Sequence, residues 1–191
     1  APHERSATPM VVAVGRLVPH KRFDALLSVV AELRPRHEGL QLVIAGEGGE
    51  RQALEKQAAA LGVQDCVRFA GRVSDHELRS LYRRAWVLAA TSVAEGFGMT
   101  ITEAAACGTP AVATRVAGHA DAVVEGRSGV LTSSRAHFAD RLDAVLADAD
   151  LRHRLSEGAA SRAAELTWDA TAAQVLRPLL ARATAGRPSS R

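Results

Sequence analysis

A Gly-x-Gly turn leads into an Ala-rich helical pattern, with one glutamate on each side of the turn. Glu95 precedes the glycines Gly96 and Gly98, and Glu103 follows one helical turn later. Amides at a helix start lack intrahelical partners, and the helix dipole adds positive charge there, so such a start binds anions, most naturally phosphate. A carboxylate such as Glu103 can accept hydrogen bonds from a vicinal diol such as ribose. The stretch predicts a site for a phosphate flanked by sugar hydroxyls.

Two cations follow the first apolar run of the chain. Arg16 and Lys21 belong to the segment GRLVPHK, which begins at Gly15. Two cations after a strand suit an anion with several oxygens, although solvated loop charges would explain this segment taken alone. The segment is not a Rossmann dinucleotide fingerprint, because the second and third glycines of that pattern are absent.

A glycine-rich segment, GEGG, follows the second apolar run and begins at Gly46. Glycines let a backbone approach a ligand closely, but a plain turn into the next helix uses them as well. A nicotinamide-dependent dehydrogenase would have an acidic residue here, which Glu47 fits, and also a Gly-rich turn after the first strand, which GRLVPH does not provide. The dehydrogenase hypothesis is therefore the weaker one.

Short apolar runs alternate with helical patterns along most of the chain. Strands are predicted over residues 10–14, 41–45, 66–69, 87–90, 111–114 and 129–131. Continuous apolar strands are typical of a parallel sheet that is covered on both faces. Ser74 and Glu77 form a capping box before a helix over 75–84, and a further helix is predicted over 99–107. The alternation predicts an α/β fold with a Rossmann-like, doubly wound parallel sheet of about six strands. Such sheets bind ligands at the carboxyl ends of their strands.

The end of the chain is predicted to be helical only. Three segments are expected, over 135–147, 150–165 and 168–184, with Thr167 capping the last. An apolar stripe in that last segment is either ordinary core or a face that docks on a neighbouring domain; it consists of Trp168, Val175, Leu176 and Leu179. We expect residues 1–9 to be a polar arm or linker, 10–185 the folded domain and 186–191 a disordered tail.

Composition excludes several classes of protein. The 191 residues include 24 basic and 21 acidic ones, a net charge of +3, and the arginines are spread along the chain rather than gathered as a nucleic-acid footprint. No apolar run approaches the roughly 18 residues that a membrane helix needs. The two cysteines have no CxxC spacing, which favours a reducing cytoplasm. The histidines have no metal-ligand spacing, so no metal site is expected.

Several motifs together resemble one known family. They are GRL with Lys21 downstream, GEGG, FAGRV around Gly71, and EGFGMTITEAAACGTPAVATRVAG. The combination resembles the nucleotide-sugar-binding half of the group 1 glycosyltransferases, which are retaining enzymes of the GT-B fold. The resemblance covers roughly residues 10–185. It implies that the chain is the C-terminal donor domain, one half of a GT-B fold, and that an N-terminal domain would hold the acceptor. The lack of an initiator Met fits such a piece of a longer protein.

The resemblance implies a role for each matching residue. Arg16 and Lys21 would hold the donor diphosphate, and Glu95 would hold hydroxyls of the donor sugar; these three are the expected catalytic residues. Glu103 would bind ribose. Val73 would border the base. The full set of expected binding residues is Gly15, Arg16, Lys21, Gly46, Val73, Glu95, Gly96, Phe97, Gly98, Met99, Thr100 and Glu103.

The implied activity is retaining, metal-independent hexosyl transfer from a UDP-sugar or GDP-sugar. The acceptor would be a sugar, a lipid or a small molecule, and neither a cofactor nor a nucleic-acid partner is implied. Membrane association is expected only through other parts of the protein. The alternative is a non-catalytic nucleotide-sugar sensor or partner domain that keeps the binding site without transfer.

This chain departs from the family pattern at several places, among them Ala105 and Ala111, which replace larger apolar residues. Arg22 stands where the family often has Gly. Ala117, Ala120 and Asp121 occupy an expected loop in which the family usually has Gly, Pro and Glu. That loop would lie near the donor sugar, so these residues bear on which sugar is bound.

Overall fold

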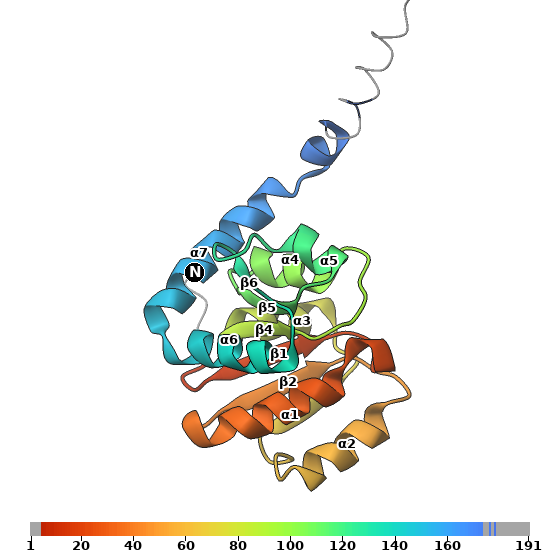
Figure 1. The fold of residues 1–191 in the computed structure, drawn as a ribbon. Helices are drawn as coiled ribbons and strands as arrows, with labels where there is room; N and C mark the ends of the chain where they lie inside the picture. Colours follow the sequence, from red (N-terminus) through yellow and green to blue (C-terminus); the bar gives the residue numbers. More distant parts are fainter. Residues whose placement is uncertain (1–4, 174–175, 177, 179–191) are drawn as a thin grey trace, which may run out of the picture.

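Six parallel strands form one sheet in the computed structural model, which describes residues 5–173, 176 and 178. The order is β3-β2-β1-β4-β5-β6 (Figure 1). The strands are β1 (Met10–Val14), β2 (Gln41–Ala45), β3 (Val67–Gly71), β4 (Val87–Ala90), β5 (Ala111–Thr114) and β6 (Gly129–Thr132). All neighbouring strands pair in parallel. The predicted α/β fold with a Rossmann-like parallel sheet is therefore confirmed.

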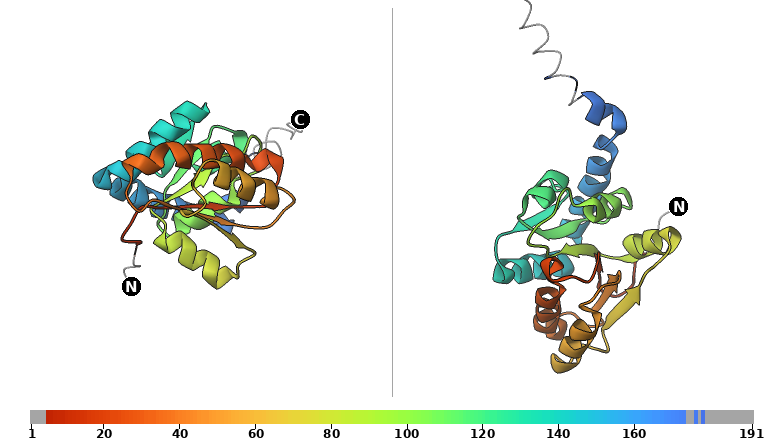
Figure 2. Two further views of the ribbon diagram at one scale, coloured as in Figure 1. Left: turned by 90° about the horizontal axis from the view of Figure 1, so that it is seen from below. Right: turned by 90° about the vertical axis from the view of Figure 1, so that its right-hand side faces the viewer.

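Helices cover both faces of the sheet. One face carries α1 (Phe23–Leu33), α2 (Arg51–Ala60) and α6 (Arg135–Ala147), and the other carries α3 (Asp75–Arg84), α4 (Met99–Ala106) and α5 (Ala117–Ala122). The left view of Figure 2 shows α1 and α3 on opposite sides of the sheet. The last long helix, α7 (Ala149–Glu165), packs against α4 and α6. Short 3₁₀ turns follow β1 (Pro19–Lys21) and α1 (Arg34–Arg36).

The central strand β1 shows why continuous apolar runs form this sheet. Successive side chains of a strand point to opposite faces. Val11 and Ala13 are buried in the core with α1 and α6, while Met10 and Val12 are buried in the core with α3 and α4. A strand buried on both faces has no position for a charged side chain, as its sequence predicted.

Most predicted boundaries agree with the structure to within a residue, and β3 is the exception. It spans Val67–Gly71 rather than 66–69, because its ladder with β2 continues past an irregularity to pair Ala45 with Gly71. The capping box of α3 is confirmed, since Ser74 Oγ accepts from the Glu77 amide at 3.3 Å and Glu77 Oε2 accepts from the Ser74 amide at 2.8 Å.

The expected loop around residues 117–121 is instead the short helix α5, so that prediction was wrong. Gly118 explains why a helix fits here. A Cβ atom at Gly118 would lie 2.5 Å from the carbonyl oxygen of Glu95, so the first turn of α5 packs directly on the backbone that follows β4. With six residues and no apolar periodicity, α5 gives little helical signal in the sequence.

The segment after α7 is helical from residue 168 to residue 173, and the expected cap is confirmed because Thr167 Oγ1 accepts from the Ala170 amide at 3.1 Å. Trp168 is 88% exposed and Leu176 is 52% exposed, so the interpretation of the stripe as core is wrong for both. Figure 1 shows this segment extending away from the sheet. Val175, Leu179 and the expected tail over 186–191 lie outside the described residues.

Candidate functional site

The strand order reverses between β1 and β4, and the loops after these two strands meet at the carboxyl edge of the sheet. The Val93 amide donates to the carbonyl of His20 at 2.9 Å, and Thr91 Oγ1 donates to the carbonyl of Lys21 at 2.8 Å. Ligands of doubly wound sheets bind at this kind of topological switch. The two loops that the sequence singled out therefore form one surface.

Lys21 and Glu95 form an ion pair across these loops. Their side chains are 16% and 19% exposed, and Ser92 Oγ also donates to Glu95 Oε1, at 2.8 Å. Partial burial disfavours the charged Glu95 carboxylate, but the hydrogen bonds from Lys21 and Ser92 outweigh that effect and hold the Glu95 pKa below its usual value. The structure thus joins two residues to which the family resemblance assigns separate roles, one on the diphosphate and one on the sugar.

His119 of α5 lies buried behind this pair. Its Nδ1 is 2.9 Å from the carbonyl oxygen of Thr114, and a carbonyl only accepts, so Nδ1 carries a proton. Burial lowers the His119 pKa, and the nearby charge of Glu95 opposes that shift. His119 is therefore neutral at pH 7 and leaves Nε2 as an acceptor. The sequence predicted a satisfied or solvated His here, and its proximity to Glu95 was not apparent.

The start of α4 provides free backbone donors. Gly98 takes the left-handed conformation (φ 70°) at the N-cap position, and no side chain caps the helix. Within the described residues, the amides of Gly98, Met99 and Thr100 donate to no acceptor. Gly98 packs close to α5, since a Cβ there would lie 3.1 Å from the Gly118 carbonyl oxygen. The predicted helix start after the Gly-x-Gly turn is thus present, and anion binding there stays a prediction.

Glu103 lies one turn into α4, and a buried tyrosine holds it in place. Tyr82 of α3 donates its hydroxyl to Glu103 Oε2 at 2.9 Å. Burial, followed by the negative charge of Glu103, raises the Tyr82 pKa well above its usual value, so the phenol stays protonated and remains a donor. Glu103 is exposed, and Oε1 has no partner among the described residues. No pattern in the sequence indicated the contact between Tyr82 and Glu103.

The remaining predicted residues lie around this core of the site. Arg16 is exposed in the loop after β1, and Phe97 is exposed in the turn before α4. Val73 is half-buried between β3 and α3. Gly46 has a structural reason to be glycine, because a Cβ there would lie 1.9 Å from the carbonyl oxygen of Gly15.

None of the predicted binding residues belongs to the wall of the cavity at this edge of the sheet. A cavity of about 480 Å³ adjoins them at the carboxyl ends of β4, β5 and β6, and Ser92, Val93 and Thr114 belong to its wall. In the part of the chain that the structure describes, no three His, Cys, Asp or Glu residues are grouped to hold a metal ion. No helix among the described residues is long and apolar enough to cross a membrane.

The model of the glycosyl transferases group 1 family matches residues 2–162. The chain belongs to this family. It is 42% identical over 179 residues to a D-inositol 3-phosphate glycosyltransferase of Frankia alni, covering 88% of this chain and 44% of the relative. A D-inositol 3-phosphate glycosyltransferase of Corynebacterium jeikeium is 41% identical over 174 residues, covering 86% of this chain and 42% of the relative. The chain thus spans less than half the length of these relatives.

Solved structures of similar proteins share the fold of this group 1 glycosyl transferase chain. Anabaena Alr3699/HepE, in a complex with UDP and glucose, aligns with a TM-score of 0.78 and 26% identity over 92% of this chain and 48% of that one. A sucrose-phosphate synthase from Thermosynechococcus elongatus aligns with a TM-score of 0.78 and 28% identity, and the alignment covers 92% of this chain and 46% of the synthase.

Proposed function

We propose that this chain is the donor-binding domain of a longer retaining hexosyltransferase that uses a nucleotide sugar. The observation that carries the proposal is the convergence of Lys21, Glu95, Glu103 and the uncapped start of α4 at the topological switch of the sheet. Anabaena HepE, with UDP and glucose bound, supports a nucleotide sugar as the ligand class. More than half of each relative lies outside the match, which leaves room for a further domain. We propose that this domain binds the acceptor and is N-terminal to this chain.

In this proposal, the donor lies along the edge between β1 and β4. Lys21 and the exposed Arg16 hold the diphosphate together with the free amides of α4, and Glu103 accepts from the ribose hydroxyls. Glu95 accepts from hydroxyls of the donor sugar. As the glycosidic bond breaks, negative charge grows on the leaving diphosphate, and preorganised cations and amides stabilise it without a metal ion. The leaving phosphate takes the proton of the acceptor. We place the enzyme in the cytoplasm.

Nucleoside diphosphates are expected to stabilise the isolated chain without a metal ion. A ligand at 100 times its dissociation constant adds about 2.7 kcal/mol to the free energy of unfolding. The measurement is the melting temperature with millimolar UDP, GDP or ADP, with and without EDTA. Lys21→Gln should reduce the shift. Arg22→Gln is the matched control, because Arg22 is the adjacent cation and pairs with Asp24 instead. A melting temperature that none of the three ligands changes would contradict the proposal.

The two glutamates are expected to respond differently to substitution. Glu103→Ala should weaken both UDP and UDP-glucose, by about 1.5 to 3 kcal/mol, because a charge-assisted hydrogen bond to ribose is lost. Glu95→Ala should weaken UDP-glucose but not UDP, because Lys21 is released from its ion pair and remains available to the phosphates. Titration calorimetry measures the four affinities. Glu55→Ala, on the distant helix α2, is the control. Equal losses for both ligands in both variants would refute the assignment.

A further inference from the structure

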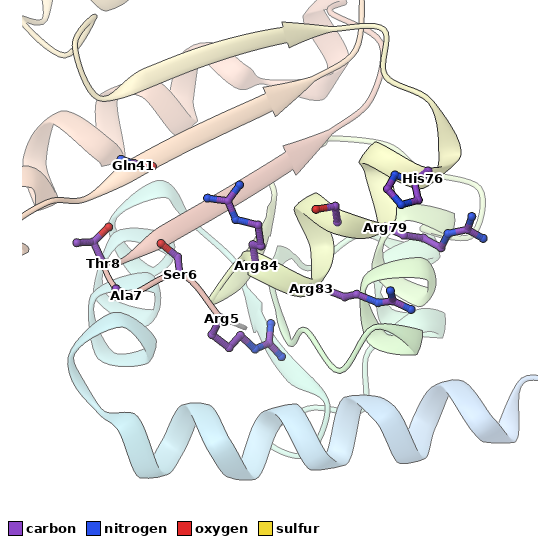
Figure 3. A pocket seen from close by; sticks show the side chains of 10 residues that line it. Arg5, Ser6, Ala7, Thr8, Gln41, His76, Arg79, Arg83 and Arg84 are labelled. Carbon is purple, nitrogen blue, oxygen red and sulfur yellow. The ribbon is translucent and has the colours of Figure 1, made fainter. Parts of the chain in front are cut away.

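A second cavity lies along the outer face of α3. It has a volume of about 910 Å³ and opens between residues 5–8 and the outer face of α3, near the start of β2 (Figure 3). Its wall consists of Arg5, Ser6, Ala7, Thr8, Gln41, His76, Arg79, Ser80, Arg83 and Arg84. We call it the arginine groove. It shares no residue with the candidate donor site.

The arginine groove is rich in basic side chains that have no acidic partner. Its wall, all of which the structure describes, includes no Asp or Glu. Within the described part of the chain, no carboxylate oxygen lies within 4.0 Å of the guanidinium groups of Arg79, Arg83 or Arg84. The Arg83 Nε atom is buried and has no hydrogen-bond partner. These charges are therefore available to an anion.

Helical spacing gathers these side chains. His76, Arg79, Arg83 and Arg84 recur at the intervals that put residues on one face of α3. Figure 3 shows the side chains of His76, Arg79 and Arg83 extending from α3 on one side of the groove, and that of Arg84 reaching toward the strands. Like charges four residues apart, such as Arg79 and Arg83, destabilise a helix. The dipole of α3 favours cations only in its last turn, so it does not account for Arg79.

Hydrogen bonds hold the opposite wall of the groove, residues 5–8, in place. The Arg5 guanidinium already donates to Thr109 Oγ1 at 2.6 Å and to Ser156 Oγ at 3.1 Å, so it anchors the arm. The Ser6 amide donates to the carbonyl of Arg84 at 2.9 Å, and Trp86 Nε1 donates to the carbonyl of Ser6 at 2.7 Å. Arm and helix are thus bound together, and the groove has a defined shape.

We propose that the arginine groove binds an anion that carries two or more phosphoryl groups. Guanidinium groups match phosphate oxygens in pairs. The basic residues from His76 to Arg84 extend about 12 Å along the helix, which is longer than one phosphate. The wall has no Phe, Tyr or Trp on which a nucleobase could stack, and Ala7 is its one apolar side chain. The ligand is therefore a polar polyphosphorylated compound or the headgroups of anionic lipids, which offer the same chemistry.

Pyrophosphate tests the proposal by titration calorimetry. Because the candidate donor site also has cations, the titrations use a Lys21→Gln background as well as the unmodified chain. Arg79→Gln with Arg83→Gln should weaken binding by at least about tenfold in both backgrounds, the equivalent of 1.4 kcal/mol. Arg154→Gln, an exposed arginine on α7 outside the groove, should have no effect. Equal affinity in the double variant and the Arg154 control would overturn the proposal, as would loss of all binding on Lys21→Gln alone.

Vesicle sedimentation identifies the source of the phosphate. Vesicles with phosphatidylglycerol are compared with vesicles of phosphatidylcholine alone. If the groove takes lipid headgroups, the chain should bind only the former, and Arg79→Gln with Arg83→Gln should abolish that binding. If the chain binds pyrophosphate but not the vesicles, the ligand of the groove is a free polyphosphorylated compound rather than a lipid headgroup. Binding to neither overturns the proposal. Unchanged melting temperatures show that the variants are folded. If UDP does not bind the chain, the proposed function fails, but the pyrophosphate and vesicle experiments still test the arginine groove.

Discussion

Replacing Gly46 by alanine is expected to destabilise the chain by about 3 kcal/mol or more. The added Cβ would lie 1.9 Å from the carbonyl oxygen of Gly15, which is backbone and has no rotamer by which to move away. The φ of 142° adds strain for any side chain. Gly15 and Gly46 follow the central strands β1 and β2, so the loop that carries Arg16 and Lys21 has to shift to make room.

Urea denaturation measures this effect, and Gly49→Ala is the matched control. Gly49 belongs to the same GEGG segment, but a Cβ there would have no neighbour within 4 Å. Its substitution should change the free energy of unfolding by no more than about 0.5 kcal/mol. Equal midpoints for the two variants would show that the close approach of the two loops does not constrain position 46.

The 191-residue chain alone is expected to transfer no sugar, even if it binds the donor as proposed. Positioning both reactants can lower a barrier by about 7 to 11 kcal/mol, and in the proposed function this chain positions only one of them. The exposed Trp168 and Leu176 fit this expectation, because large exposed apolar side chains are typical of surfaces that contact another protein or domain. The measurement is product formation from UDP-glucose and candidate sugar, lipid and small-molecule acceptors.

Glu95→Ala is the control for background hydrolysis and transfer. Glycosylated acceptor formed by the chain alone, above that control, would show that an acceptor domain is not needed. A longer protein that also contains the proposed N-terminal acceptor-binding domain should transfer the sugar. A full-length protein that binds the donor and still transfers nothing would favour the alternative of a nucleotide-sugar sensor.

The sequence predicts the elements that short-range patterns determine. Apolar runs gave all six strands, and Ser74 with Glu77 marked the start of α3, because a capping box is complete within four residues. The turn before α4 was also predictable, because its glycines Gly96 and Gly98 lie within a few residues of each other and of the helix start. The placement of the candidate residues after the strands followed from the general rule for parallel sheets rather than from any contact between them.

Contacts between distant segments could not be predicted from these patterns. Lys21 and Glu95 are 74 positions apart, and Tyr82 and Glu103 are 21 apart, so both pairs depend on how the loops and helices pack. The helix α5 forms where Gly118 packs on the backbone after β4, which is a tertiary contact. Trp168 was interpreted as a possible core residue because large apolar side chains are usually buried. Its sequence neighbours do not distinguish a core position from an exposed one, because that depends on the segments that pack around it.

The Lys21–Glu95 ion pair has a consequence for turnover in the proposed enzyme. A nucleotide sugar can replace both partners at once, with phosphate for Lys21 and sugar hydroxyls for Glu95. After transfer, the remaining nucleoside diphosphate satisfies Lys21 but leaves the partly buried Glu95 carboxylate short of its cation, which is costly. Re-forming the pair then favours departure of the spent nucleotide. If the proposed function is right, we therefore expect the Lys21–Glu95 pair to limit product inhibition and to prepare the site for the next donor.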